Sequence, residues 1–424
     1  MNMSELIVEQ PLVNSAGIEQ AAARLAGIAR RTPLELNYTL SHQYDCNVWL
    51  KREDLQVVRS YKLRGAYNKM ATLSAAERQA GIVCASAGNH AQGVAFACRK
   101  LGIPGHIFMP TTTPGQKVNK VAAFGSSSVE IVLTGDTFDD AYAAAQTFCA
   151  AQQAVFIHPF DDEKIIEGQG TVGLEIWEDA EVQPDFLFVP IGGGGLAAGV
   201  SSFFAEKSPA TAIVGVEPAG AAAMKASLQN GFNTTLDDID RFVDGAAVRR
   251  AGDLTFDICR RLLYDILLIP EGKVCSTILK LYNEEAIVVE PAGALSIAAL
   301  DFYRPHIRGK NVVCVVSGGN NDISRTEEIR ERALLYEGLK HYFIVRFPQR
   351  AGALKEFVVD VLGPEDDIVH FEYIKKNNRE AGPALVGIEF KQPGQLERLQ
   401  NSLRRRHFNF EYLNGNSDLL RFLI

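Results

Sequence analysis

Lys62 is the residue in this chain whose chemistry is most open to interpretation. It lies in the stretch RSYKLRGAY, just inside the start of a predicted helix. An ordinary lysine at such a position is solvated and charged. A lysine that is buried, or that faces positive dipoles, is neutral part of the time and can form a Schiff base with a carbonyl compound. The immediate neighbours of Lys62 are compatible with both interpretations.

A glycine-rich stretch, PIGGGGLAAG at residues 190–199, follows the apolar run FLFV and opens a predicted helix. Backbone N–H groups there can converge on a phosphate, and the helix dipole favours its negative charge. Four consecutive glycines lose much conformational entropy on folding, and a simple turn does not need all four of them. Phosphate binding is therefore the favoured interpretation. A dinucleotide site is the competing interpretation, because Gly192, Gly194 and Ala197 fit G-x-G-x-x-[GA] and Glu217 closes the next strand.

Two further stretches place polar groups after apolar runs. In CASAGNHAQGVA (residues 84–95), Ser86 and Asn89 offer donors for a carboxylate or a phenolic oxygen, although Asn89 also suits a helix N-cap with His90 solvated. In VVSGGNND (residues 315–322), Ser317 is a cap or a hydroxyl presented to a ligand. The carboxyl ends of parallel strands are where open α/β sheets bind ligands. A lysine, a phosphate cradle and a strand-end hydroxyl together indicate pyridoxal phosphate.

The elements that position these residues alternate from about residue 48 onward. Short apolar runs, among them NVWLK, GIVCAS, GHIFMP, FLFVPI, AIVGVE and NVVCVVS, are separated by helical stretches predicted at 61–79, 89–101, 115–124 and 137–152 and from near residue 164. This alternation predicts βαβ units and a largely parallel sheet that is covered on both faces.

The pattern changes after the charged segment 324–339, which we interpret as a connecting helix. The remaining residues follow the order strand, helix, strand, strand, helix, strand, which is the ferredoxin-like order. We therefore predict one domain at 1–338 and a second at 339–424. Pro348 and Gly352 shape a loop in the second domain whose helix N-terminus can receive a carboxylate. A plain turn in an oligomerisation module is the alternative.

Composition narrows the possible partners and the compartment. The 424 residues are 47% hydrophobic and carry a net charge of −8, with no basic run longer than the three arginines at 404–406. This argues against nucleic acid or an anionic membrane as the main partner. The seven cysteines are scattered and show no metal-finger spacing, and the first 15 residues lack a signal-peptide pattern. We expect a cytoplasmic protein.

Four stretches in this order, SYKLRGAYNKM, SAGNHAQGVA, GGGGLAAG and SGGNND, resemble the fold-type II pyridoxal-phosphate enzymes. They are most similar to the threonine dehydratases (threonine ammonia-lyases) of isoleucine biosynthesis, and the similarity covers roughly residues 10–338 and continues into the tail. The resemblance implies an α/β catalytic domain of two open parallel-sheet subdomains with the cofactor in the cleft between them. It also implies a single C-terminal ACT-like regulatory domain.

Site roles follow from the resemblance for the positions that match. Lys62 would form the Schiff base with pyridoxal 5'-phosphate and act as the base at Cα, and Asn89 would bond the phenolic oxygen of the cofactor. Ser317 would face the pyridine nitrogen. The phosphate would be held by Gly192, Gly193, Gly194, Gly195 and Leu196. The substrate carboxylate would be received by the loop of Ser86, Ala87, Gly88 and Asn89.

The implied reaction is β-elimination of L-threonine to 2-oxobutanoate and ammonia, with L-serine open as a second substrate. A neutral hydroxyl at Ser317 cannot hold a full positive charge on the pyridine ring, so the carbanion is short-lived and elimination is favoured over transamination. No side chain stands out as the acid for the leaving hydroxyl, and the cofactor phosphate is the family's candidate.

Close relatives of the family remain as alternatives, namely serine dehydratases and serine racemases. Racemases carry a second serine where this chain has Ala87, and that serine supplies the base on the opposite face. They also bind a divalent cation with an acid where this chain has Ala223; Glu217 alone is a poor oxygen cage, so we expect no metal. An amino-acid sensor or a nucleotide-binding protein is the alternative from another class.

The ACT-like domain implies feedback inhibition by isoleucine, with valine as an opposing effector. Family behaviour also implies a homotetramer. Allostery in this sense requires two sites whose ligands differ in affinity between two states.

Overall fold

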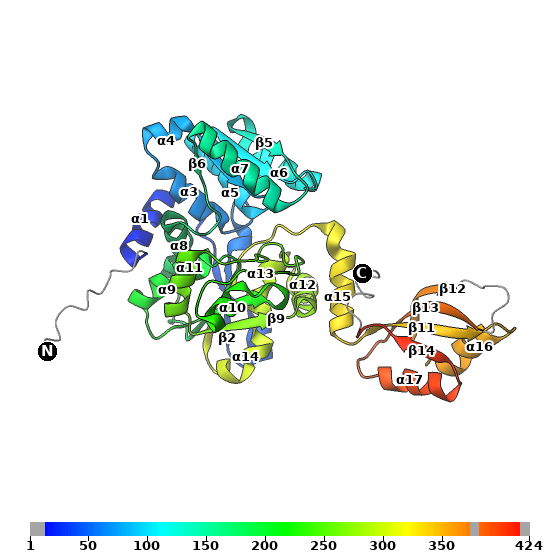
Figure 1. Cartoon of the computed structure of the whole chain (residues 1–424). Coiled ribbons are helices and arrows are strands. Elements are labelled where there is room, and N and C mark those ends of the chain that lie inside the picture. The colour runs from blue at the N-terminus through cyan, green and yellow to red at the C-terminus, as the bar shows by residue number, and fades with distance from the viewer. Residues whose placement is uncertain (1–12, 374–380, 416–424) are drawn as a thin grey trace, which may run out of the picture. The chain divides into compact units, whose positions relative to one another are not determined.

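The computed structural model describes residues 13–373 and 381–415, and Figure 1 shows the whole chain. The N-terminal stretch tested above for a signal peptide lies mostly outside the described residues. The chain divides into two compact units: the first is formed by residues up to 270 and by 287–321, and the second by 271–286 and by the residues from 322 onward. The predicted domain boundary at 338/339 falls inside the second unit and stays a prediction.

The first unit contains two sheets. The larger sheet has the strand order β1-β2-β10-β7-β8-β9 and is parallel except for the β1–β2 pair. Its strands are β1 Leu34–Leu36, β2 Asn47–Arg52, β7 Phe186–Pro190, β8 Ala212–Pro218, β9 Asp265–Ile269 and β10 Asn311–Val316. The smaller sheet has the order β5-β4-β3-β6 and is parallel throughout. Its strands are β3 Ile82–Ala85, β4 Gly105–Met109, β5 Val129–Leu133 and β6 Val155–Phe156.

Helices cover both sheets, as the alternating pattern predicts (Figure 1). They are α1 Ser15–Leu25, α2 Tyr38–Tyr44, α3 Lys62–Ala71, α4 Ala75–Ala80, α5 Asn89–Leu101, α6 Gly115–Gly125, α7 Phe138–Gln152, α8 Glu163–Asp179, α9 Gly195–Lys207, α10 Ala223–Asn230, α11 Asp253–Leu262, α13 Pro291–Ala298 and α14 Leu300–Ile307. The prediction of βαβ units with a mainly parallel sheet is confirmed. Residues of β3 and β10 are almost entirely buried, which explains why these strands read as continuous apolar runs.

One predicted helix, 61–79, is wrong as a single element. The structure ends α3 at Ala71 and begins α4 at Ala75. Ser74 accepts a hydrogen bond from the Glu77 backbone, and the Glu77 side chain bonds back to the Ser74 backbone. This capping box satisfies the free N–H groups of a new helix start, and therefore separates the two helices.

A buried ion-pair cluster fixes α3 to the larger sheet and to α8. The Arg64 guanidinium donates to Glu53 (2.7 and 2.8 Å) and to Glu175 (2.7 and 2.8 Å), while the Lys51 ammonium donates to Glu175 (2.6 Å). Arg64, Lys51 and Glu53 are at most 1% exposed. Removing one partner of such a cluster leaves a buried charge uncompensated and costs about 3–5 kcal/mol. The cluster therefore holds the helix that begins at Lys62.

The second unit contains an antiparallel sheet of order β12-β13-β11-β14. Its elements are α12 Glu271–Glu285, α15 Thr326–Tyr336, β11 Lys340–Pro348, α16 Ala353–Glu356, the π-helical turn Phe357–Val361, β12 Asp367–Tyr373, β13 Ala381–Glu389, α17 Leu396–Arg405 and β14 Asn409–Tyr412. The element order and the strand order together are those of a ferredoxin-like fold, so this prediction is confirmed. The first helix of this order is only partly α-helical, because α16 ends at Glu356 and a π-helical turn follows at Phe357–Val361.

Helices α12 and α15 belong to this second unit. A Cβ at Gly272 on α12 would lie 2.4 Å from Cβ of Tyr336 on α15, so the two helices approach closely there. Glu331 on α15 accepts hydrogen bonds from Lys340 and from the Tyr342 hydroxyl, both on β11. The connecting helix is thus attached to the antiparallel sheet by partly buried polar contacts.

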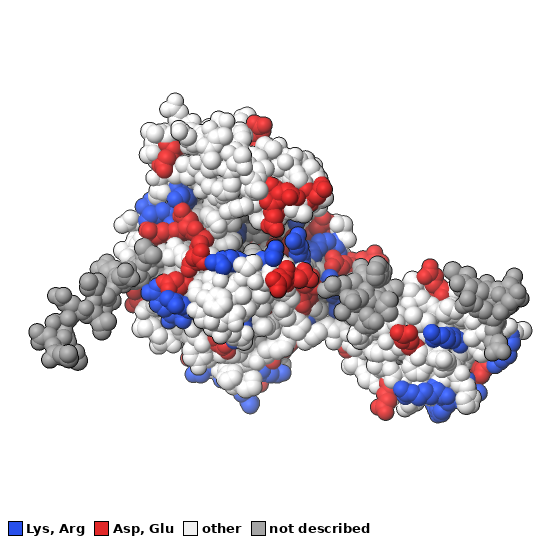
Figure 2. All heavy atoms as spheres, viewed as in Figure 1, with Lys and Arg blue, Asp and Glu red and all other residues white. Residues whose placement is uncertain are grey.

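The surface and the cysteines agree with the composition. On the face shown in Figure 2, basic and acidic side chains are interspersed over the described residues. All seven cysteines are free thiols, and six of them are buried. Within residues 13–373 and 381–415, no helix has the length and apolar character needed to cross a membrane.

Candidate active site

Lys62 lies at the first position of α3 and its side chain is half-buried. The Nζ atom donates a hydrogen bond to the backbone oxygen of Pro159 (2.8 Å) and lies 5.3 Å from the centre of the Tyr61 ring. Burial lowers the pKa of Lys62 to about 8, against the opposing effect of the Glu290 carboxyl. An amine with such a pKa is neutral for part of the time near physiological pH, as a nucleophile or base must be.

Ser317 follows β10 and lies beside the segment that leads into α3. The Tyr61 backbone N–H donates to the Ser317 carbonyl (3.2 Å), and the Gly319 N–H donates to the Arg59 carbonyl (2.9 Å). Ser317 is 3% exposed. Two stretches far apart in the sequence, 59–61 and 317–319, are therefore held together at the same edge of the larger sheet.

Asn89 is the first residue of α5, but its side chain does not cap that helix. Its Nδ2 donates to Oε1 of Glu290 (2.7 Å), and its Oδ1 accepts from Nδ2 of Asn320 (2.8 Å). The interpretation of Asn89 as an N-cap is therefore wrong. The interpretation of His90 as solvated is also wrong, because His90 is 4% exposed and its Nε2 lies 2.8 Å from the Ile157 carbonyl.

The loop of Ser86, Ala87 and Gly88 connects β3 to α5 and is half-buried. The Gly88 N–H donates to Oγ of Ser86 (3.2 Å), and a Cβ at Gly88 would meet no atom within 4 Å. The space beside this loop is thus open, next to the N-terminus of a 13-residue helix. Such a position suits a small anion such as a carboxylate.

The glycine stretch Gly192–Gly195 connects β7 to α9, as predicted. Gly194 has φ +93°, a left-handed conformation that a residue with a side chain rarely adopts. Leu196 is 2% exposed and packs in the apolar core, so only its backbone is available to a ligand. The Thr255 hydroxyl donates to the Gly193 carbonyl (2.6 Å) and fixes the stretch from the side of α11.

Pro159 and Phe160 link the lysine to the glycine stretch. The Pro159 carbonyl accepts from Lys62, and the Phe160 ring occupies the space that a Cβ at Gly193 would need, with a closest approach of 2.2 Å. The structure therefore brings Lys62, Asn89, Ser317, the loop of residues 86–88 and the glycine stretch together at the carboxyl ends of β3, β7 and β10.

Three residues at this location were missed by the sequence reasoning: Phe160, Glu290 and Asn320. Asn320 lies inside the quoted stretch SGGNND, but no pattern distinguished it from its neighbours. Glu290 stands as a carboxyl within the otherwise apolar VVEPAGA, directly before a proline that opens α13. A charged residue in an apolar run was the available signal for it.

Glu217 is the acid of the alternative dinucleotide site, but its carboxyl is hydrogen-bonded to backbone N–H groups of this chain. It accepts hydrogen bonds from the N–H groups of Met224 and Lys225 (both 2.8 Å), and burial raises its pKa to about 7. Glu217 therefore stabilises the start of α10.

Comparison with known proteins identifies the family. The family described as "Pyridoxal-phosphate dependent enzyme" matches residues 25–318, and "C-terminal regulatory domain of Threonine dehydratase" matches residues 331–423. The chain is 57% identical over 400 residues to the biosynthetic L-threonine dehydratase of Halalkalibacterium halodurans, covering 94% of this chain and 96% of that protein. It is 55% identical to the Bacillus subtilis protein of the same name, over the full length of both.

Solved structures are similar as well. The processed form of threonine deaminase isoform 2 from Solanum lycopersicum is 41% identical, with a TM-score of 0.71, covering 78% of this chain and 97% of that one. Maize serine racemase is 30% identical, with a TM-score of 0.70, covering 77% of this chain and 99% of that one. The chain thus belongs to the pyridoxal-phosphate-dependent enzymes of fold type II and, among them, to the biosynthetic L-threonine dehydratases.

Proposed function

We propose that this protein is a threonine ammonia-lyase that converts L-threonine to 2-oxobutanoate and ammonia by β-elimination, with Lys62 as the catalytic base. The observation that carries the proposal is the half-buried Lys62 amine, whose pKa is lowered to about 8 by burial. The polar groups of Asn89 and Ser317 and the glycine stretch surround the same strand ends. The chain shares 55–57% sequence identity with two biosynthetic threonine dehydratases over nearly its whole length, which supports L-threonine as the substrate.

The residues present suit pyridoxal 5'-phosphate. Lys62 offers an amine of lowered pKa for the aldehyde, and the backbone of Gly192–Gly195 and Leu196 opens α9 where a phosphate is favoured. The Ser60 hydroxyl, close to Ser317 in the paired segments, is buried without a hydrogen-bond partner among the described residues. We assign Asn89 to the phenolic oxygen and Ser317 to the pyridine nitrogen. When bound, the cofactor withdraws electrons from Cα of an amino acid and makes the Cα proton acidic.

The protein's own residues then select elimination. The loop Ser86–Asn89 receives the substrate carboxylate and orients Cα toward Lys62, which removes the proton. Ala87 presents a methyl group where a second base would be needed to reprotonate the opposite face, so racemisation is disfavoured. His90 does not compete as an acid, because burial lowers its pKa to about 3, and burial likewise lowers the pKa of His158.

Steady-state kinetics test this function. The purified protein should release 2-oxobutanoate from L-threonine, and Lys62→Ala should reduce turnover by at least roughly a thousandfold. Lys69→Ala is the matched control, because Lys69 lies on the same helix and pairs with Asp162 instead (2.7 Å). Near-normal turnover by Lys62→Ala would refute the role of the lysine. Preference for L-serine in kcat/KM would move the assignment to a serine dehydratase.

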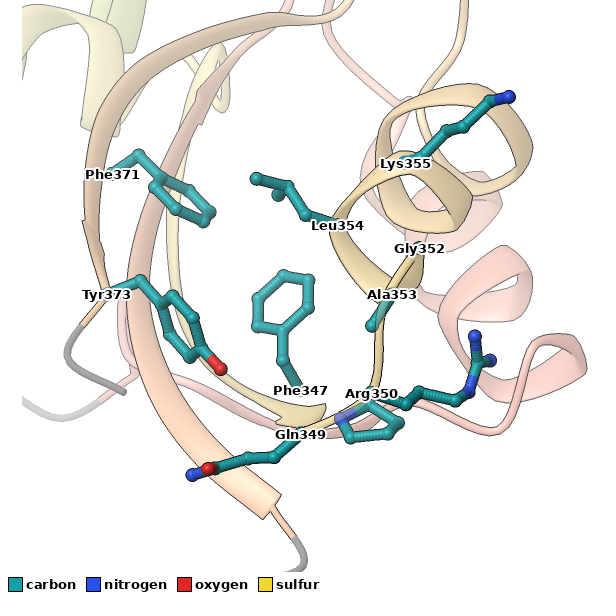
Figure 3. Close-up of a pocket in the computed structure, with 10 residues that line it drawn as sticks. Phe347, Gln349, Arg350, Gly352, Ala353, Leu354, Lys355, Phe371 and Tyr373 are labelled. Carbon is teal, nitrogen blue, oxygen red and sulfur yellow. The ribbon is translucent and has the colours of Figure 1, made fainter. Parts of the chain in front are cut away.

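For regulation, we propose that isoleucine binds a cavity of about 280 Å³ in the ferredoxin-like part of the second unit (Figure 3). Apolar side chains from β11, β12 and α16 line it, including Phe347, Phe371 and Leu354. Gln349 also lines the cavity, and its Nε2 atom is buried beside Gly382 on β13, without a hydrogen-bond partner among the described residues. An apolar wall and an unsatisfied donor suit a small amino acid with an aliphatic side chain and a carboxylate. Valine would compete for the same cavity as an opposing effector.

A substitution at Gln349 tests this cavity. Gln349→Leu removes the donor at similar volume, so the isoleucine concentration for half-inhibition should rise by roughly tenfold, while turnover without isoleucine is unchanged. Gln392→Leu, at an exposed position outside the cavity, is the control. Equal isoleucine sensitivity of both variants would exclude Gln349 from the effector site.

We also propose a homotetramer in the cytoplasm. Seven free thiols support a reducing compartment, and light scattering of the purified protein measures the assembly directly. A monomeric or dimeric mass at working concentration would overturn the tetramer.

A further inference from the structure

Glu290 is a buried carboxyl at the candidate active site, and none of the roles proposed for binding the cofactor or the substrate involves it. It is 5% exposed and occupies the N-cap position directly before α13. Its side chain makes no capping hydrogen bond. Instead, its Oε1 accepts a hydrogen bond from Nδ2 of Asn89 (2.7 Å), a residue 201 positions earlier in the chain. The carboxyl is therefore directed to the active site and not to its own helix.

The surroundings of Glu290 are built to admit this carboxyl. A Cβ at Gly318 would lie 2.3 Å from Oε1 of Glu290, so a residue with a side chain at 318 would displace it. The Glu290 N–H donates to the Gly318 carbonyl (3.2 Å), which fixes the backbone that carries the carboxyl. Gly318 directly follows Ser317, so the carboxyl is held beside two residues assigned to the cofactor.

Glu290, Asn89 and Asn320 form a closed set of hydrogen bonds. Nδ2 of Asn320 donates to Oδ1 of Asn89 (2.8 Å), and the Asn320 backbone donates to the Glu290 carboxyl. Nδ2 of Asn320 also donates to the Val58 carbonyl (2.8 Å), just before the segment that leads to Lys62. Both ends of the Asn89 amide are thereby paired, and one N–H of its Nδ2 remains for a ligand.

This set determines which way the Asn89 amide faces. A carboxyl oxygen next to Asn89 can accept but, while ionised, cannot donate, so the NH₂ end of the amide must face Glu290. Burial raises the pKa of Glu290 to about 7, with Asp244 adding to the effect, and the bonds from Asn89 and Asn320 oppose it. A protonated carboxyl still has a carbonyl oxygen for the same bond, and Nδ2 of Asn320 holds Oδ1 of Asn89 from the other side, so the amide keeps its orientation when Glu290 is protonated.

We propose that Glu290 is a positioning residue that holds the Asn89 amide with the remaining N–H of Nδ2, and not its oxygen, turned toward the phenolic oxygen of the cofactor. The inference rests on the proposed role of Asn89 and deepens it. A reversed amide would place its oxygen against the cofactor oxygen and lose the hydrogen bond. Glu290 thus acts on cofactor affinity through Asn89.

A double-mutant cycle tests this coupling with a readout other than activity. The dissociation constant for pyridoxal 5'-phosphate is measured by equilibrium dialysis of the full-length protein. Asn89→Ala should raise the Kd by roughly tenfold, the effect of losing one hydrogen bond. Glu290→Gln, which keeps the shape but lets either end of the side chain face Asn89, should raise the Kd by roughly threefold to tenfold alone. In the Asn89→Ala background the same change should have an effect of less than about twofold.

Glu217→Gln is the matched control, because Glu217 is also a buried carboxyl whose pKa is raised to about 7 by burial, but it bonds the α10 backbone. Any effect of Glu217→Gln should add to that of Asn89→Ala. Glu290→Asp, which shortens the side chain by one methylene, provides a second variant with the same expected non-additivity if the glutamine variant is poorly folded. Additive effects of Glu290 and Asn89 would overturn the positioning role. An unchanged Kd in Asn89→Ala would instead overturn the role proposed for Asn89 itself.

Discussion

Lys62 combines two properties that a surface lysine lacks: a half-buried side chain and a lowered pKa. Burial is the main cause of the lowered pKa, and the Glu290 carboxyl opposes it. Within residues 13–373 and 381–415, the Nζ atom of Lys62 donates a hydrogen bond only to a neutral carbonyl, that of Pro159, at 2.8 Å. Because no carboxylate among the described residues pairs directly with the Lys62 ammonium, a larger fraction of this amine is neutral at a given pH than in an ordinary lysine.

The pKa of about 8 predicts how the Lys62 amine reacts in the cofactor-free protein. Below pH 8 the amine is protonated and unreactive, and above it the amine is neutral. Between pH 8 and about 10.4, the pKa of an ordinary lysine, Lys62 should therefore be modified by an amine reagent while solvated lysines are not. Peptide mapping by mass spectrometry across this range measures the midpoint. A midpoint of the Lys62 modification near pH 10 would show that the protein environment does not lower the pKa of this lysine.

Part of the site could be predicted from the sequence because its residues lie in short stretches with recognisable local patterns. The stretches around Lys62, Asn89, Gly192–Gly195 and Ser317 each follow a strand and open a helix or turn, so their types and order are informative. The partners of Asn89 could not be predicted, because Glu290 and Asn320 lie 201 and 231 positions further along the chain. Their contact depends on how β3 and β10 are placed in different sheets, which no periodicity encodes.

At the scale of elements, the site depends on how closely α5 approaches α3. A Cβ at Gly93 on α5 would lie 3.0 Å from the Leu63 backbone nitrogen and 3.1 Å from the Lys62 carbonyl carbon. These neighbours are backbone atoms and cannot rotate away. The start of α3, and with it Lys62, is therefore set by a glycine on the neighbouring helix.

Gly93→Ala should separate the two helices and displace Lys62. We expect a loss of about 1–3 kcal/mol in the free energy of unfolding from overpacking, and a fall in kcat of roughly tenfold or more from the displaced base. Chemical denaturation and threonine turnover measure the two effects. Gly115→Ala, where a Cβ would meet no atom within 4 Å, should change neither by much. Wild-type behaviour of Gly93→Ala would show that the contact can relax without moving the lysine.

The sequence pattern predicts the strands and the helices that have clear boundaries. It does not predict helix boundaries that depend on local caps or on packing. The alternation of apolar runs and helices predicted the parallel sheets. The break at Ser74 was missed, although the Ser-x-x-Glu capping box is visible in the sequence. The π-helical turn at Phe357–Val361 has no comparable sequence signal.

At the scale of the whole molecule, the division into units differs from the order of residues along the chain. Helix α12 belongs to the second unit with α15 and the antiparallel sheet, yet the chain continues from α12 through residues 287–289 to Glu290. Ala286, at the end of α12, has φ +54°, which is strained for a residue with a side chain. A domain boundary drawn along the sequence does not capture this interleaving.

Two truncations separate regulation from catalysis. A chain that ends after Leu339 keeps α15 against α12 and should retain threonine turnover while losing inhibition by isoleucine. A chain that ends after Asn321 also loses α15 and exposes the face of α12 that packs against Tyr336, so its thermal stability should be lower. Turnover with and without isoleucine, together with thermal unfolding, distinguishes the two. Full isoleucine inhibition in the chain that ends after Leu339 would place the effector site outside the removed residues.

The most direct test of the account is the identity of the residue that holds the cofactor. Borohydride reduction of the holoenzyme makes the bond between lysine and cofactor permanent, and peptide mass spectrometry then locates it. We expect one modified peptide per chain, with the adduct on Lys62 of RSYKLRGAY. An adduct on Lys69, on any other lysine, or on none would contradict it.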